Sequence, residues 1–150
     1  MTDVSAFETF VGDAEPRLRR TLVARFGVEV GNDLTADVIA YAWEHWEAIA
    51  SMANPVGYLY RVGQSSARRY RRWGRRPSLP VEESFSPADP EPALGAALAR
   101  LRPDQRTAVL LVHAYGWSYA EAAEVLDIPI TTLRNHLHRG LARLRQNLEP

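Results

Sequence analysis

One stretch of the sequence, residues 77–92, limits the possible folds more than any other because it is unsuited to a core. It holds five of the chain's ten prolines and four acidic residues, and it is poor in aliphatic side chains. A segment of this composition buries too little apolar surface to offset the entropy of ordering it. We therefore expect a Pro-rich acidic linker, roughly 50 Å long when extended, between one domain at residues 1–76 and another at residues 93–150.

On both sides of this linker, apolar residues recur mostly at helical spacing, and few segments alternate with a period of two. The fold class is therefore predicted to be all-α, with two small helical domains. The chain has no cysteine, which excludes a disulfide framework and a thiolate metal site. It has neither a signal-peptide pattern at its start nor an apolar run near the roughly 20 residues that a spanning helix needs. We expect a soluble cytoplasmic protein without membrane insertion.

The net charge is zero, but the charges are distributed unevenly. Residues 1–60 hold nine acidic residues against four arginines, whereas residues 61–76 hold seven arginines and no acid. A second basic island, residues 133–150, has a net charge of +3. Electrostatic potential acts over roughly a Debye length of 10 Å, so these islands are more informative than the total.

The C-terminal domain has the order of signals that is typical of a DNA-binding motif. Pro103 is expected to open a helix that ends at Gly116. Ser118, followed by Glu121 three residues later, predicts a capping box and a second, short helix. Asp127 then occupies a turn position that needs left-handed backbone, which aspartate tolerates. These signals predict a helix-turn-helix at about residues 118–139.

The last helix, predicted to start after Pro129 at Thr131 or Thr132, has two different faces. A leucine stripe is formed by Leu133, Leu137, Leu141, Leu144 and Leu148. The opposite face presents Thr131, Arg134, Asn135, His138 and Arg139. A recognition helix needs such a face, because its N-terminal residues reach base edges while arginines hold phosphates. The alternative is an amphipathic surface helix whose polar side is only solvated.

A second basic helix is predicted in the N-terminal domain, where Asn54 and Pro55 supply a cap and a first-turn proline. One face would carry Leu59, Val62, Ser66, Tyr70 and Trp73, and another Tyr58, Arg61, Ser65, Arg68 and Arg72. Arginines interleaved with aromatic residues suit a surface that tracks a nucleic-acid backbone while bases stack on rings. We expect Tyr70 and Trp73 in the core, and Tyr58 and Tyr60 as the stacking residues.

The preceding helix, at about residues 33–49, is predicted to carry an acidic face. Its buried side would contain Leu34, Val38, Ala42, Trp46 and Ile49, with Asp33, Asp37, Glu44 and Glu47 pointing outward. A row of carboxylates repels phosphate, so this face should not contact DNA. It faces either solvent or a basic protein partner, and the residues alone leave both open.

In this order, the segments resemble the extracytoplasmic-function (ECF) class of bacterial RNA polymerase sigma factors over nearly the whole chain. The likeness is strongest in ALARLRPDQRTAVLLVHAYGWSYAEAAEVLDIPITTLRNHLHRGLARLR, which follows the pattern of sigma region four. It extends to DLTADVIAYAWEHW and NPVGYLYRVGQSSARRYRR, which look like the polymerase-binding and promoter-melting helices of region two. The resemblance implies a sigma factor that binds core RNA polymerase and directs promoter recognition, melting and transcription initiation.

The resemblance also implies roles for individual residues. The distal promoter element would be read in duplex form by Thr131, Thr132, Arg134, Asn135, His136, His138 and Arg139. The proximal element and its unpaired strand would be held by Tyr58, Tyr60, Arg61, Gln64, Ser65, Arg68, Arg69 and Arg72. Polymerase would be bound by Asp33, Asp37, Trp43 and Trp46. Sigma factors of this class often have an anti-sigma partner as well, although no residue here displays a site for one.

Three departures from the family pattern involve four residues. Ser65 and Arg69 stand where an asparagine and an acidic residue are common, so the sequence read at the proximal element is open. Asp127 replaces the turn glycine, and Pro129 replaces the usual serine cap of the recognition helix.

Two other functions compete with this interpretation. A free-standing helix-turn-helix regulator would bind operator DNA without polymerase, usually as a dimer on a two-fold site. An enzyme would need a chemical centre, but His136 and His138 are two residues apart and point in different directions on a helix. The chain also has no Gly-rich phosphate loop. We therefore expect no enzymatic activity, no cofactor and no metal.

Overall fold

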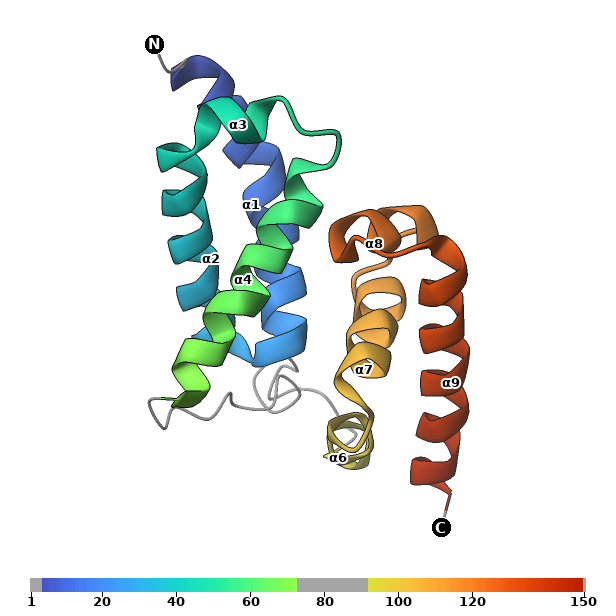
Figure 1. The fold of residues 1–150 in the computed structure, drawn as a ribbon. Helices are drawn as coiled ribbons and strands as arrows, with labels where there is room; N and C mark the ends of the chain where they lie inside the picture. The colour runs from blue at the N-terminus through green and yellow to red at the C-terminus, as the bar shows by residue number, and fades with distance from the viewer. Residues whose placement is uncertain (1–3, 73–91, 150) are drawn as a thin grey trace.

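The apolar residues at helical spacing do form helices. The computed structural model describes residues 4–72 and 92–149, and within these ranges the chain is helical without a strand (Figure 1). The predicted all-α class is therefore confirmed. Within the same ranges, no helix combines the length and the apolar character that crossing a membrane would require.

The N-terminal half consists of α1 (Val4–Phe26), α2 (Val28–Glu44), α3 (Trp46–Ala50) and α4 (Pro55–Arg72). Helices α1 and α2 lie side by side and are joined at Gly27, whose φ of 94° favours glycine. A second glycine, Gly31, allows the close crossing, because a Cβ there would lie 2.6 Å from the Cα of Val23. Helix α4 packs across α1 and α2 and completes this half.

The acidic helix differs from the prediction at both ends. It begins at Val28 rather than Asp33, and it is interrupted at His45, where φ is −119° and ψ is 26°. The His45 Nδ1 donates to the carbonyl oxygen of Tyr41 at 3.0 Å, and the two rings stack with centroids 4.1 Å apart. The burial pattern is nevertheless correct, because all five residues predicted to face inward are buried: Leu34, Val38, Ala42, Trp46 and Ile49.

The C-terminal half consists of α6 (Pro92–Ala99), α7 (Pro103–Val109), a π-helical turn (Leu110–Ala114), α8 (Tyr119–Leu126) and α9 (Ile130–Leu148). Pro92, the last residue of the predicted linker, opens α6. The rest of that linker lies outside the described residues. Pro103 begins α7 as expected, and Gly116, with a φ of 72°, lies in the bend before α8.

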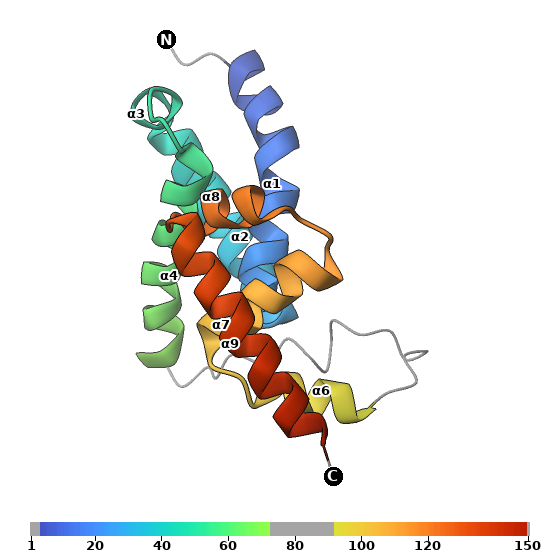
Figure 2. The same cartoon turned by 90° about the vertical axis from the view of Figure 1, so that its right-hand side faces the viewer.

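The two halves pack against each other. Helix α4 lies against α8, and α1 lies against α7 and α8 (Figures 1 and 2). Buried residues of both halves, among them Leu22, Leu59, Leu111 and Leu137, belong to one hydrophobic cluster. The surfaces with predicted DNA contacts are therefore parts of one packed body.

Candidate nucleic-acid interface

The helix-turn-helix forms at the predicted residues. Ser118 caps α8, since its Oγ accepts a hydrogen bond from the backbone N–H of Glu121 (3.1 Å) and lies 3.0 Å from that residue's carboxylate. Asp127 ends the helix in the left-handed conformation, with φ 55° and ψ 48°. The cap by Ser118 and the left-handed turn are confirmed, and the Glu121 carboxylate accepts from the Ser118 hydroxyl. Helix α9 starts at Ile130, one or two residues earlier than expected, because Pro129 itself takes the extended cap position.

Helix α9 separates its buried and exposed sides as a recognition helix does. Leu133, Leu137 and Gly140 are buried, with Leu141 and Leu144 packed at the edge of the core, whereas Leu148 is exposed at the end of the stripe. The exposed face carries Thr131, Arg134, Asn135, His138 and Arg139. Thr132 and His136 are half-buried. The polar and basic residues thus share one free face along the N-terminal part of the helix.

His136 lies apart from that exposed face. It lines a cavity of about 150 Å³ between the two halves, together with Arg25, Tyr60, Gln64 and Asp104. In this conformation His136 therefore faces the N-terminal half, and a base contact would require that half to move away.

Helix α4 brings most of the second predicted set together. Arg61, Ser65, Arg68 and Arg69 are exposed, and Tyr58 and Gln64 are half-buried. Asn54 caps the helix, since its Oδ1 accepts from the backbone N–H of Gly57 at 3.1 Å. Arg72 is the last residue of α4, but its side chain lies outside the described set, as do the side chain of Tyr70 and the whole of Trp73.

Tyr60 differs from the expectation that it is an accessible stacking residue. It is only 2% exposed, because α4 turns it toward the C-terminal half. Burial raises the pKa of its hydroxyl to about 12, and the nearby charge of Arg25 opposes that shift. Gln64 donates from Nε2 to the Tyr60 hydroxyl at 3.3 Å. Tyr60 has no ring face free for a base here.

Tyr58 contacts a tyrosine of α2, Tyr41. Its hydroxyl lies 2.9 Å from the hydroxyl of Tyr41 on α2, and this shared hydrogen bond, with burial, raises the pKa of Tyr41. The bond fixes the start of α4 against the middle of α2. Tyr58 thus remains partly accessible while its position is fixed.

The predicted polymerase face combines carboxylates with an aromatic cluster. Asp37 is exposed and Asp33 is half-buried on α2. Trp43 is 42% exposed, with its ring centroid 5.0 Å from that of Phe7 on α1. Trp46 is 8% exposed and packs on Phe7 and Phe10. Trp43 is therefore available for contact, whereas Trp46 is part of the core and shares the neighbour Phe7 with it.

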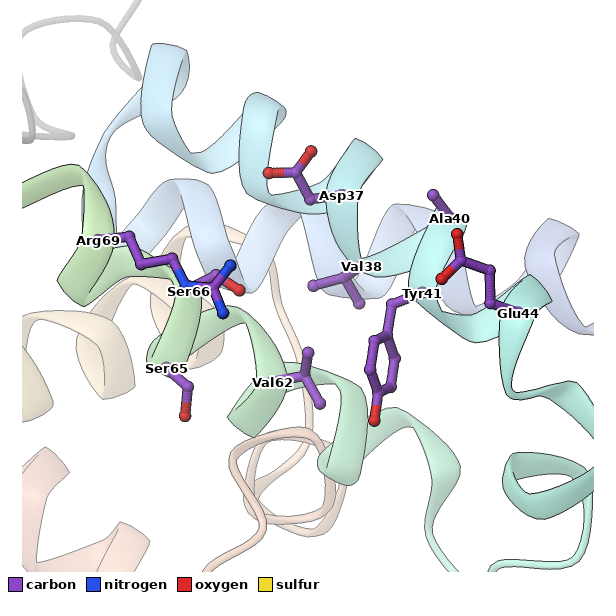
Figure 3. Close-up of a pocket in the computed structure, with 9 residues that line it drawn as sticks. All are labelled: Asp37, Val38, Ala40, Tyr41, Glu44, Val62, Ser65, Ser66 and Arg69. Atoms are coloured by element: carbon purple, nitrogen blue, oxygen red, sulfur yellow. The ribbon is translucent and has the colours of Figure 1, made fainter.

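A groove joins this acidic face to the basic face of α4 (Figure 3). Its volume is about 590 Å³. Asp37, Tyr41 and Glu44 line the side formed by α2, and Ser65 and Arg69 line the side formed by α4. Ser65 and Arg69, two of the four residues that depart from the family pattern, thus both line this groove. In the described ranges, no group of three or more His, Cys, Asp or Glu residues could hold a metal ion.

Residues 92–144 match the family model described as sigma-70, region 4. The chain is 31% identical to an RNA polymerase sigma-E factor of Streptomyces antibioticus, over 98% of this chain and 87% of that protein. It is 26% identical to the ECF RNA polymerase sigma factor SigL of Mycobacterium tuberculosis, over 78% and 73%. The sigma factor RpoE of Bartonella quintana, solved in complex with the anti-sigma factor NepR, shares the fold with a TM-score of 0.66 at 24% identity, over 97% of this chain and 98% of that one.

These similarities extend well beyond the helix-turn-helix that a free-standing regulator would also have. They cover both halves of the chain and are similarities to sigma factors. The chain belongs to the ECF class of RNA polymerase sigma factors.

Proposed function

We propose that this sigma factor reads the distal promoter element with the exposed face of α9. The observation that carries this assignment is the exposure of Arg134, Asn135, His138 and Arg139 opposite the buried leucines of the same helix. The N-terminal turns of such a helix enter the major groove, where arginine pairs with guanine and asparagine with adenine. His136 joins this set once the two halves separate.

The test is run-off transcription with core polymerase from promoters that the protein itself selects. Each base-edge contact contributes about 1–3 kcal/mol, which corresponds to roughly 5- to 150-fold. Arg134→Ala and Arg139→Ala should each lower transcription within this range. Arg145→Ala removes the same charge from the last turn of α9 and serves as the control. Equal activity of all three variants would refute the assignment of α9.

The exposed side of α4 is the proposed binding surface for the proximal element and its unpaired strand. Arg61, Ser65, Arg68 and Arg69 supply the backbone contacts, and Tyr58 supplies a partly accessible ring. Tyr60 and Gln64 are added when the C-terminal half moves away. Arg68→Ala should weaken binding of a single-stranded proximal-element oligonucleotide, whereas Arg19→Ala, a charge loss on α1, should not. An equal effect of both changes would argue for a nonspecific charge effect.

The acidic and aromatic face of α2 is the proposed binding site for core polymerase. We propose that the protein acts with this partner in the cytoplasm. Replacing Asp33 and Asp37 with arginine should abolish co-purification with core polymerase while helix content stays unchanged. Trp43→Ala should weaken the same interaction without loss of stability, because Trp43 is exposed. Retained co-purification in both variants would return this face to a solvated role. Glu149→Arg, at the end of α9, is the charge control.

An anti-sigma factor is a further proposed partner, because the solved sigma factor that shares this fold is in complex with one. We assign the chain no catalytic activity of its own, since promoter recognition and polymerase binding need only contacts.

A further inference from the structure

Ion pairs between the two halves share one polarity. Within the described residues, each pair has its arginine on the N-terminal half and its carboxylate on the C-terminal half. The pairs are Arg17 with Glu124 at 3.2 Å, Arg25 with Asp104 at 2.5 Å and Arg61 with Asp127 at 3.1 Å. The charge of Arg25 and its hydrogen bond lower the pKa of Asp104 in spite of the burial that opposes them. The arginine side thus forms an anion-binding surface, and acids of α7, α8 and the turn occupy it.

This arginine surface continues beyond the three pairs. A cavity of about 360 Å³ between the end of α1 and α4 is lined by Arg25, Arg61 and Arg68, with Gln64 and Ser65 beside them. Of the residues that the structure describes, no acidic one lines it. Arginine is the usual partner of phosphate, since its planar fork donates several hydrogen bonds in one direction. The surface therefore has the chemistry of a nucleic-acid backbone site that extends from α4 onto α1.

Neutral contacts close the same interface. Asn54 donates from Nδ2 to the carbonyl oxygen of Glu124 at 2.8 Å, so the start of α4 is tied to the end of α8. Tyr60 is buried beside Thr107 and Ile128. As a result, the C-terminal half covers Tyr60 and forms an ion pair with Arg61. Both residues belong to the proposed binding surface for the proximal element.

We propose that the carboxylates of Asp104, Glu124 and Asp127 act as an intramolecular stand-in for DNA phosphates. They cover a DNA-backbone surface formed by Arg17, Arg25 and Arg61. In the free protein this contact keeps the DNA-binding surface of α4 covered, and the halves must separate before that surface can bind a promoter strand. This inference rests on the proposed role of α4, and it adds Arg17 and Arg25 to the DNA-binding residues.

The three ion pairs between the halves are weak enough to be broken when DNA binds. The side chains in the three pairs are between 21% and 68% exposed, and exposed ion pairs are weak and screened by salt. Arg106 opposes closure, because it is buried and, among the described residues, its Nε has no hydrogen-bond partner. Its Nη2 donates to the carbonyl oxygen of Arg25 at 3.4 Å. Opening returns this cation to water, and phosphates can then replace the carboxylates.

A substitution at Asp127 can remove one of the three carboxylates without damage to the helix-turn-helix. Its backbone is left-handed, a conformation that glycine adopts at least as readily. Asp127→Gly therefore keeps the turn and removes the carboxylate that meets Arg61. Asp104→Asn and Glu124→Gln complete a neutralised triple variant that leaves every predicted DNA-binding residue in place.

The first experiment measures the distance between the halves and the binding of DNA in the full chain. Because the chain has no cysteine, dyes can be placed at two cysteines introduced at the exposed positions Ser51 and Arg143. The triple variant should lose energy transfer and bind a single-stranded proximal-element oligonucleotide at least five-fold more tightly. Glu149→Gln should change neither quantity. Unchanged energy transfer or unchanged affinity in the triple variant would overturn the proposal.

A charge swap tests separately the closing role of the carboxylates and the DNA-binding role of the arginines. Arg17→Glu combined with Glu124→Arg restores one pair with inverted polarity, so energy transfer should stay at the wild-type level while oligonucleotide affinity falls below it. In the triple variant, Arg17→Gln should lower the affinity that was gained. Arg68→Ala in the same background tests the proposed role of α4. If Arg68→Ala lowers affinity and Arg17→Gln does not, the inference fails alone. If Arg68→Ala has no effect, the proposed function of α4 fails.

Discussion

Ionisation of Tyr60 should weaken the folded, closed protein in alkaline solution. Burial raises the pKa of Tyr60 to about 12, against an ordinary value of 10. Below pH 10 the hydroxyl is protonated in both the folded and the unfolded chain, so its contribution to stability is complete. Between pH 10 and 12 the unfolded chain loses the proton while the folded one retains it. The free energy of unfolding should fall by roughly 3 kcal/mol over these two pH units.

Urea unfolding at steps between pH 9 and pH 12 measures this loss. Tyr60→Phe is the matched control, because it keeps the ring and removes only the hydroxyl that Gln64 meets. The difference between wild type and Tyr60→Phe isolates one of the chain's six tyrosines. The tyrosinate absorbance assigned to Tyr60 by the same difference should rise near pH 12. If the two proteins lose stability in parallel, the burial argument is wrong.

Three further changes test the packing that positions the site. Ser118→Ala should cost about 1 kcal/mol of unfolding free energy through loss of the cap of α8, and a change within error would show that this cap is not needed. Gly31→Ala should cost about 1–3 kcal/mol, because the new Cβ would meet the backbone of Val23 at 2.6 Å; Gly12→Ala, with nothing within 4 Å, should stabilise α1 slightly, and equal effects of the two would contradict the close crossing. Leu137→Ala should cost about 2–5 kcal/mol, since this side chain on the inner face of α9 is fully buried. A smaller loss in thermal unfolding would mean that the core collapses around the cavity.

The helix-turn-helix was predictable from local chemistry. Ser118 with Glu121 is a short-range hydrogen-bond pattern, and Asp127 is one of the few residues that tolerate left-handed backbone. Neither needs information from the rest of the chain. The same is true of the stripe that buries Leu133 and Leu137, since helical spacing alone assigns it to one face.

Two features of the fold were missed for different reasons. Helix α1 was not predicted, although Ala14, Leu18 and Leu22 recur every four residues and are fully buried. A stricter count of periodicity would have found it, in spite of Pro16 inside the helix. The break at His45 depends on its own hydrogen bond and ring stack with Tyr41, which spacing does not reveal.

The burial of Tyr60 lay beyond any pattern in its own helix. Its neighbours Arg61 and Ser65 are exposed as expected. Tyr60 is covered because α8 packs on α4 and because Thr107 of α7 lines the same small cavity. Contacts between halves depend on residues far apart in sequence, such as Asn54 with Glu124. Periodicity describes which side of a helix is apolar but not which partner arrives there, so the cross-half ion pairs had no signal in the sequence.

The covalent connection between the halves should determine whether they stay closed. Exposed ion pairs contribute roughly 0.2–1 kcal/mol each, so three of them are too weak to join two separate chains at micromolar concentration. A short tether holds two modules at an effective concentration of roughly millimolar, where a contact of only about 4 kcal/mol is half formed. We expect the ion pairs and the tether, rather than the apolar residues shared by the halves, to determine closure. Cleavage at a protease site inserted between residues 84 and 85 should then let the halves elute separately from a sizing column at micromolar concentration. Co-elution after complete cleavage would mean that buried contacts around Tyr60, rather than the tether, hold the closed state.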